Sequence, residues 1–269
     1  MSSLSSELSS SEVERGAVRL WWLGQAGFAF KAHNGLVALV DPYLSDAVER
    51  LHGFKRLSLA PMCAEDVRAG LVCITHEHAD HLDPDALPVI ARNNPDCVFV
   101  APEGCTEGLE QAGVAADRRI VLRPGQACEL DGVTIHPAQA DHGDYAPTAV
   151  SLLLNFDGVR VLYPGDTALR PSLIQPLCDP RPDVLLPCIN GGFGNMTHID
   201  AAMLAQQVRP RFAIPCHFWT FAEQGAGDPA GFLHACGHFC PDVTAMLLRP
   251  GEGFTCVRVG GTAEEGGHE

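Results

Sequence analysis

Length, composition and charge set the first limits on this chain. It has 269 residues, of which 46% are hydrophobic and 19% charged, and these values fit a soluble globular protein with a sizeable core. Its 18 Lys and Arg against 33 Asp and Glu give a formal charge of -15, which argues against a nucleic-acid partner because phosphates are repelled. No apolar stretch approaches the roughly 18 to 20 residues that cross a bilayer, which argues against a membrane partner. The eleven cysteines, none in a CxxC pair, favour reduced thiols and a cytoplasmic location.

The two ends of the chain differ in composition from the middle. Residues 1–16 and 261–269 are poor in apolar residues, so we expect a disordered N-terminal tail and a loose C-terminal tail. The N-terminal segment also lacks the basic start and apolar run of a signal peptide. No long Pro-, Gly- or Ser-rich linker divides the middle, and we therefore expect residues 17–260 to form a single domain.

Short apolar runs alternate with helical patterns along the chain. In chain order, the expected strands outside the hairpins are VRLWWLG, FAFKA, LVALVD, LVCITH, VFVAP, IVLRPG, VLLPCI, FAIPCHF and FTCVRV. Two hairpins are expected in the middle of the chain, with turns at Asp131-Gly132 and Asp157-Gly158. The expected helices are DPDALPVIARN, EGLEQAG, HIDAAMLAQQV and DPAGFLHACGHF. Strands and helices in both halves predict an α/β (α+β) fold in which two sheets are covered by helices, a four-layer αββα sandwich rather than a doubly wound parallel sheet.

The strongest chemical signal lies in the segment Thr75-His76-Glu77-His78-Ala79-Asp80-His81-Leu82-Asp83. It follows the apolar strand LVCIT and places three imidazoles and a carboxylate within six positions. In an extended segment residues i and i+2 share a face, so His76 and His78 can reach one metal ion. As the chain turns into the next helix, Asp80 and His81 can reach a second point a few Å away. A solvated polar loop is the alternative, but packed imidazoles at a strand end cost stability unless a metal binds them.

Three later strand ends offer further ligands, because loops on a rigid scaffold converge at such ends. His142 follows the strand VTIHPA and is a candidate third nitrogen for the first metal, or else a turn residue. Asp166 ends the strand VRVLYPG, where its carboxylate can bridge two cations or form an Asx turn. His217 ends the strand FAIPC and is a candidate ligand of the second metal, or else a packed strand-end histidine.

This order of motifs resembles the metallo-β-lactamase superfamily. Within that superfamily, LWWLGQAGFAFK, DPYLSD, THEHADHLD, PGDTALR, GNMTHIDAAML and PCHFWTF resemble the L-ascorbate-6-phosphate lactonase family, over about residues 18 to 258. The resemblance implies a metallo-β-lactamase fold and a dinuclear site. Its implied ligands are His76, His78 and His142 for one metal, Asp80, His81 and His217 for the other, and Asp166 between them, with Asp41 supporting the site.

The expected ligands determine the expected chemistry. With no cysteine among them, two divalent ions of Zn, Mn or Fe fit the nitrogen and oxygen donors. A hydroxide held between such ions would open a lactone or related ester, including one of a phosphorylated sugar acid, with Asp80 accepting or relaying the proton. A small-molecule phosphodiesterase on the same site is the main alternative. A mononuclear iron oxygenase and a non-enzymatic binding module rank lower.

Several other residues adjoin the expected ligands or form weaker patterns. The candidates for substrate contact are Asn195, His198, Arg170, Tyr43 and Trp219, each of which is alone more often a cap, surface or packing residue. A string of alternating histidines and cysteines lies on an expected helix: His234, Cys236, His238 and Cys240. Side chains two residues apart on a helix point to different faces, so this pattern favours a structural role over a metal site. The expected partner is a small-molecule substrate, and the resemblance implies that a homo-oligomer can form.

Overall fold

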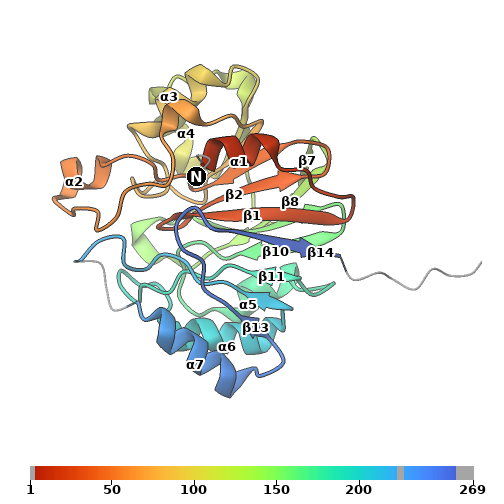
Figure 1. Cartoon of the computed structure of the whole chain (residues 1–269). Coiled ribbons are helices and arrows are strands. Elements are labelled where there is room, and N and C mark those ends of the chain that lie inside the picture. The colour runs from red at the N-terminus through yellow and green to blue at the C-terminus, as the bar shows by residue number, and fades with distance from the viewer. Residues whose placement is uncertain (1–3, 223–226, 259–269) are drawn as a thin grey trace, which may run out of the picture.

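Two β-sheets, each of seven strands, face each other in the computed structural model, which describes residues 4–222 and 227–258 (Figure 1). In spatial order the first sheet contains β14 (Gly253–Val257), β1 (Ala17–Gly24), β2 (Gly27–Ala32), β3 (Val37–Val40), β4 (Leu71–Cys73), β5 (Val98–Ala101) and β6 (Arg119–Val121). The second contains β13 (Thr244–Ala245), β12 (Phe212–Ala213), β11 (Val184–Leu185), β10 (Val159–Tyr163), β9 (Val150–Phe156), β8 (Val133–Gln139) and β7 (Cys128–Leu130).

The two sheets share one plan. In the first, β1, β2 and β3 are antiparallel and β3 to β6 are parallel. In the second, β7 to β10 are antiparallel and β10 to β13 are parallel. The strands that carry the expected metal ligands into the site, β4, β8, β10 and β12, are thus divided between the two sheets.

Helices cover the outer face of each sheet (Figure 1). On the first sheet these are α1 (Leu4–Ser10), α3 (Ala86–Asn93) and α4 (Thr106–Gln111), and on the second they are α5 (Pro171–Ile174), α6 (His198–Val208) and α7 (Pro229–Phe239). A further short helix, α2 (Ala47–His52), projects at one end. The predicted four-layer αββα sandwich is confirmed. No helix within residues 4–222 and 227–258 is both long and apolar enough to cross a membrane.

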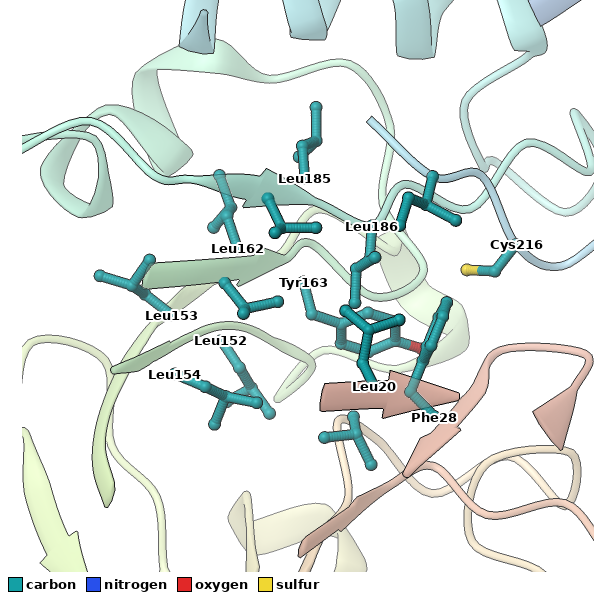
Figure 2. Close-up of a cluster of buried hydrophobic side chains, with 14 of the residues drawn as sticks. Leu20, Phe28, Leu152, Leu153, Leu154, Leu162, Tyr163, Leu185, Leu186 and Cys216 are labelled. Atoms are coloured by element: carbon teal, nitrogen blue, oxygen red, sulfur yellow. The ribbon is translucent and has the colours of Figure 1, made fainter. Parts of the chain in front are cut away.

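Strand periodicity divides the apolar side chains between the layers. In β1, Leu20 and Trp22 face the second sheet, whereas Trp21 and Leu23 pack under the outer helices. Figure 2 shows Leu20 and the neighbouring Phe28 of the first sheet meeting side chains of β9, β10 and β11. This shared core fixes the two sheets against each other and therefore fixes the edge where their loops meet.

Both expected hairpins are present, and turn chemistry explains them. Asp131-Gly132 joins β7 to β8 and Asp157-Gly158 joins β9 to β10. All four residues have positive φ, between 47° and 91°, which a two-residue type I′ turn requires and which Asp and Gly tolerate. The expected helices over residues 198–208 and 229–239 are also present.

The N-terminal segment differs from the expected disordered tail over residues 1–16. Residues 4–10 form α1, whose Leu4 and Leu8 are buried in the same cluster as Trp21. Glu7 Oε1 accepts hydrogen bonds from Trp21 Nε1 at 3.1 Å and from Arg19 Nη2 at 2.5 Å. Leu4 and Leu8 are spaced i, i+4, so both lie on one face of this polar helix and pack on the sheet. The expected C-terminal tail, 261–269, lies outside the described residues.

Replacing Leu8 by alanine should lower the free energy of unfolding by about 2 to 3 kcal/mol, because it removes a buried side chain that is only 4% exposed. Denaturant unfolding of the two proteins measures this difference. The exposed neighbour Ser9 supplies the control, and Ser9→Ala should change stability by less than about 0.5 kcal/mol. Equal stability of Leu8→Ala and the parent chain would mean that α1 does not dock in solution.

Candidate metal centre

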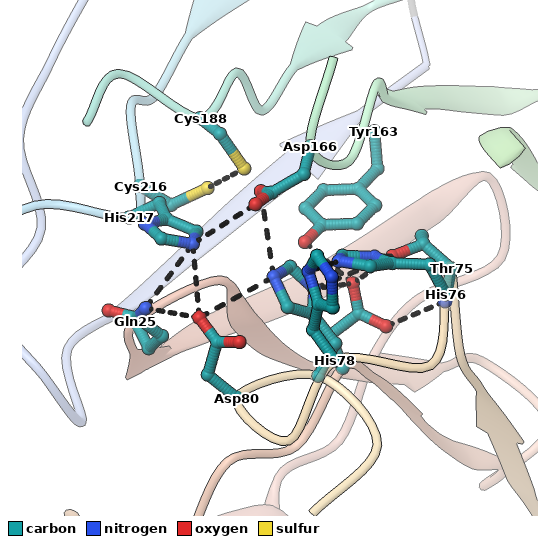
Figure 3. Close-up of polar contacts among 12 residues, drawn as sticks. Gln25, Thr75, His76, His78, Asp80, Tyr163, Asp166, Cys188, Cys216 and His217 are labelled. Carbon is teal, nitrogen blue, oxygen red and sulfur yellow. Dashed lines mark hydrogen bonds and ion pairs between the residues drawn. The ribbon is translucent and has the colours of Figure 1, made fainter. Parts of the chain in front are cut away.

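The expected ligands meet at one edge of the sandwich, where strands from both sheets end. His76, His78, Asp80 and His81 follow β4 of the first sheet. The second sheet supplies the others from the ends of β8, β10 and β12, namely His142, Asp166 and His217. A hydrogen bond from Val150 N–H to Thr75 O, 3.1 Å long, ties the two sheets together beside the site. Figure 3 shows Asp80, Asp166 and His217 pointing toward one another.

The first group of donors consists of His76, His78 and His142. Nδ1 of His78 lies 2.9 Å from Nε2 of His76 and 3.3 Å from Nε2 of His142. In a tetrahedral zinc site with bonds near 2.1 Å, neighbouring ligand atoms are about 3.4 Å apart. The three imidazoles are thus spaced like ligands of one ion, and they form one of the clusters whose donor atoms all lie within 4.8 Å.

The second group of donors consists of Asp80, His81 and His217, which form another such cluster. Nε2 of His217 lies 3.3 Å from Asp80 Oδ2, and Nε2 of His81 lies 3.8 Å from the same oxygen. Asp166 stands between the groups. Its Oδ2 is 3.4 Å from His217 Nε2 and 3.9 Å from His142 Nε2, so one carboxylate reaches a histidine of each group.

Unsatisfied polar atoms indicate that these residues fit metal ions. Nε2 of His81 and Oδ1 of Asp166 are buried 3.5 Å apart, and neither has a hydrogen-bond partner among the described residues. Burying a polar atom without a partner is costly, so native proteins rarely do it outside functional sites. A cation bound by both atoms would satisfy them. Imidazole nitrogens with carboxylate oxygens are a donor set suited to Zn, Mn or Fe.

Asp41 holds the histidine-rich turn from below. Its Oδ1 accepts from Thr75 N–H at 2.8 Å, and its Oδ2 accepts from Thr75 Oγ1 at 2.6 Å and from Tyr163 O–H at 2.9 Å. The same Oδ2 lies 2.8 Å from His81 Nδ1, which leaves Nε2 of that ring turned toward Asp166. A carboxylate behind a ligating histidine fixes the tautomer and orientation of the ring. Asp41 thus contacts Thr75 and His81 of the histidine-rich turn, and its support of a metal site stays a prediction.

Two amide side chains complete the polar contacts. Asn195 Nδ2 donates to Asp166 Oδ2 at 2.6 Å, so this candidate substrate contact instead meets a carboxylate of the centre. Sequence reasoning did not single out Gln25, whose Nε2 donates to Asp80 Oδ2 at 2.8 Å and lies 3.2 Å from His217 Nε2. Gln25 is buried in the turn between β1 and β2 with a φ of 49°, features that the structure shows and the sequence does not.

Charges within the second group perturb one another strongly. Burial would lower the pKa of His217, but the Asp166 and Asp80 carboxylates raise it from 6.5 to about 10. Burial likewise opposes charge on His81, yet Asp166 and Asp41 raise its pKa well above the usual value. For Asp80 and Asp166, burial would raise the pKa, but the two imidazolium charges hold it well below the usual range. In the protein without metal, these shifts favour the protonated form of both His81 and His217 at neutral pH.

In the first group, the pKa shifts of His76 and His142 run in the opposite direction. Burial lowers the pKa of His76 well below 6.5, helped by the charge of His81, and burial also lowers the pKa of His142. Metal ions bind neutral imidazole, so an ion entering this group displaces few protons.

We expect metal binding to release about two protons per chain at pH 7, one each from His81 and His217. Isothermal titration of Zn²⁺ into chelator-treated protein, repeated in buffers with different ionisation enthalpies, measures this number. The observed heat should depend on the buffer. If that heat is the same in every buffer, His81 and His217 are already neutral and the ion pairs described above are absent in solution.

The same pKa shift predicts how stability depends on pH in chelator-treated protein. The pKa of His217 is 6.5 in an unfolded chain and about 10 in the fold, so protonation stabilises the fold fully below pH 6.5. That contribution should fall as the pH rises from 6.5 through about 10. Urea unfolding at several pH values within this window measures it. His217→Gln lacks the titrating group, so its stability should fall less over the same window.

A small pocket opens above the donors. Its volume is about 260 Å³, and the donors that reach it are His78, Asp80, His142, Asp166 and His217. The buried side chain of Asn190 also lines it, and Asn190 Oδ1 has no hydrogen-bond partner among the described residues. The pocket therefore gives a small molecule access to the metal ligands.

The structure places the other four candidate substrate contacts outside the residues that line this pocket. Tyr43 is fully buried with its ring against Phe221, and Arg170 forms an ion pair with Asp141 at 2.6 Å. His198 is the first residue of α6, whose cap is Thr197. Trp219 is 64% exposed and lines a separate apolar cavity of about 520 Å³ on the other side of the 217–220 segment.

The cysteine-rich patterns have structural roles. On α7 and at its C-cap, Cys236 and Cys240 are buried while His234 and His238 are exposed, so the four side chains do not converge. Cys216 turns away from the pocket into the core, where its Sγ lies 3.7 Å from Cys188 Sγ.

Comparison with known proteins agrees with this geometry. A family model described as a beta-lactamase superfamily domain matches residues 19–217. The chain belongs to the metallo-β-lactamase superfamily. A UPF0173 metal-dependent hydrolase from Archaeoglobus fulgidus is 31% identical over 255 residues, covering 88% of this chain and 98% of that protein. A UPF0173 metal-dependent hydrolase from Hyperthermus butylicus is 29% identical, and the match covers 86% of this chain and 96% of that protein. This superfamily member is therefore a metal-dependent hydrolase of the UPF0173 family.

Solved structures show the same fold. Igni18, a metallo hydrolase from Ignicoccus hospitalis, has a TM-score of 0.71 and 24% identity, covering 89% of this chain and 98% of that chain. An isothiocyanate hydrolase from Delia radicum gut bacteria has a TM-score of 0.71 and 17% identity. The match covers 90% of this chain and 100% of that chain. The UPF0173 relatives are named for their metal dependence and not for a substrate. The likeness to L-ascorbate-6-phosphate lactonases thus remains a resemblance of sequence segments.

Proposed function

We propose that this metal-dependent hydrolase opens a lactone or a related carboxylic ester on two divalent cations, Zn or Mn or else Fe. The observation that carries the proposal is the position of Asp166, whose Oδ2 lies 3.4 Å from His217 of one donor group and 3.9 Å from His142 of the other. A carboxylate in that position suits two ions a few Å apart better than one.

The chemistry of such a pair fits ester opening. His76, His78, His142, Asp80, His81, His217 and Asp166 would hold two divalent cations, which would lower the pKa of a bound water toward about 7 and polarise the substrate carbonyl. Asp80 is the more exposed of the two carboxylates, 12% against 5% for Asp166, so it is better placed to accept a proton and exchange it with solvent. Asn190 offers a neutral amide to orient the substrate within the pocket.

Small phosphodiesters are the second candidate substrate class, because the same ligands serve both reactions. A panel separates the two classes: several neutral γ- and δ-lactones and bis(p-nitrophenyl) phosphate, assayed on the protein loaded with the metal that elemental analysis finds. We expect lactones to be opened with the higher kcat/KM and chelation to abolish turnover. Faster phosphodiester cleavage, or lactone opening that survives chelation, would contradict the proposal.

We also propose that the protein works in the cytoplasm on a small molecule. The eleven cysteines support a reducing compartment, since those within the described residues are free and Cys188 and Cys216 lie 3.7 Å apart without a bond. Size-exclusion chromatography with light scattering tests the expected capacity to form a homo-oligomer.

A further inference from the structure

The walls of the pocket differ in chemistry from its floor. The metal-ligand side chains form the floor, whereas Val48, Phe54, Tyr145 and Phe193 line the walls. Val48 belongs to α2 and Phe54 follows it, while Tyr145 and Phe193 come from loops of the second sheet. Apolar groups thus face the entering molecule on both sides.

The aromatic wall is held in place. The Tyr145 and Phe193 rings meet edge to face with centroids 6.5 Å apart, and the Tyr145 ring lies 5.9 Å from that of the ligand His142. Phe193 has a φ of 54°, a conformation that a bulky residue rarely adopts and that surrounding structure must enforce. Phe193 is 47% exposed and Tyr145 61%, so both rings stand at the mouth and not in the core.

No Lys or Arg side chain lines the pocket, although all 18 Lys and Arg lie within the described residues. The arginines on neighbouring segments have other partners. Arg50 pairs with Asp85 at 2.7 Å, and Arg170 pairs with Asp141 at 2.6 Å. Arg56 donates to the Tyr43 and Ser45 carbonyl oxygens. These are the groups that would otherwise bind a phosphate or carboxylate on the part of a substrate remote from the metals.

The remaining polar groups of the walls are weak partners for an anion. Asn190 is an uncharged amide, so it offers an anion no ion pair. His52 lines the rim but is exposed to solvent, and Lys55, next to Phe54, is exposed and not a lining residue. An anionic group against these walls would lose hydration without gaining a partner.

We propose that the substrate beyond its scissile bond is small, uncharged and apolar, and that Phe54, Tyr145 and Phe193 select it. The identity of the bond cleaved rests on the function proposed above, whereas the selection for a neutral tail rests on the walls alone. A volume of about 260 Å³ suits a substrate of the size of a monocyclic lactone or a short acyl ester. Phosphorylated sugar acids, with their remote phosphate, are excluded by the same walls.

Binding of two matched hydroxamates tests the proposal without relying on turnover. Hexanohydroxamic acid and adipic monohydroxamic acid share a metal-binding head and a six-carbon chain, and only the second ends in a carboxylate. Calorimetric titration into Zn²⁺-loaded protein should give about tenfold or more tighter binding of the neutral probe. Equal affinity, or tighter binding of the adipic probe, would overturn the proposal.

A substitution at the wall should reverse the preference. Phe193→Arg places a cation at the half-exposed mouth and should tighten the adipic probe relative to the hexanoic one by about fivefold or more. Phe193→Leu keeps an apolar wall and should preserve the neutral preference, and thermal unfolding verifies that both variants fold. An unchanged ratio in Phe193→Arg would show that this wall does not contact the tail.

Kinetics distinguish a failure of this proposal from a failure of the proposed function. If neither neutral nor anionic lactones are opened but the hydroxamates still differ tenfold, the reaction is wrong and the tail selection stands. If γ-valerolactone and a lactone bearing a carboxylate are opened equally well, the function stands and the tail selection is wrong.

Discussion

Replacing Asp166 by alanine should lower kcat/KM for lactone opening by at least about 10³-fold and reduce the metal content of the purified protein. Within residues 4–222 and 227–258, Asp166 is the one carboxylate whose oxygen reaches a histidine of each donor group, His142 and His217. Without it the two groups lose their shared ligand, and the buried imidazoles lose the negative charge that balances a cation. Steady-state kinetics and elemental analysis of the same preparation measure both effects.

Asp144 provides the matched control for that variant. It is an exposed carboxylate on the loop that carries His142, so Asp144→Ala changes the local charge without removing a metal contact. Its activity should stay within about threefold of the parent protein. Parent-like kinetics and metal content in Asp166→Ala would show that the centre does not depend on a shared carboxylate.

The second large effect is expected at Asp41. Asp41→Ala should lower the free energy of unfolding by about 3 to 5 kcal/mol, because it leaves buried donors of Thr75, Tyr163 and His81 without their acceptor. The His81 ring also loses the group that orients it. Metal affinity of the folded variant should therefore fall by about 10- to 100-fold. Urea unfolding measures the first effect and competitive chelator titration the second.

A variant of a second buried carboxylate, Asp83, serves as the control that distinguishes a loss of stability from a loss of metal affinity. Asp83 is fully buried and accepts hydrogen bonds from Leu44, Ser45 and Ala86, and within the described residues it makes no hydrogen bond or ion pair with a donor of the centre. Asp83→Ala should cost similar stability while leaving the metal affinity of the folded protein within about threefold. Equal losses of metal affinity in the two variants would mean that Asp41 acts only through the fold.

Much of the fold could be predicted because local chemistry specifies it. Asp-Gly at 131–132 and at 157–158 forced two-residue turns, and the Thr197 to Val208 segment carries both its cap and its apolar face. The docking of α1 could not be read in the same way. Its segment is mostly serine. The two leucines, Leu4 and Leu8, are buried only because the folded first sheet places Trp21 beside them.

That the candidate metal ligands lie together was predictable for a related reason. Imidazoles and carboxylates at strand ends are rare enough to indicate a site, and parallel strands bring their ends to one edge. The supporting residues carry no such signal. Gln25, Thr75 and Tyr163 are single polar residues in apolar surroundings, and only the assembled sheets show that they reach Asp80 or Asp41.

The pocket walls lay beyond sequence reasoning. Phe54, Tyr145 and Phe193 belong to three segments far apart in the sequence, which line one pocket only in the folded chain. Tyr43 and Trp219 appeared equally suitable from their positions near the ligands. One is buried behind Phe221, and the other turns toward a different cavity. The direction of a loop side chain is set by packing and not by its distance along the chain.

Metal stoichiometry tests the central claim most directly. Protein purified without chelator and then dialysed against excess Zn²⁺ should contain about two metal ions per chain by elemental analysis, and Asp166→Ala should contain clearly fewer. One ion or none in the saturated parent protein, or two retained in Asp166→Ala, would contradict the account of two donor groups joined by one carboxylate.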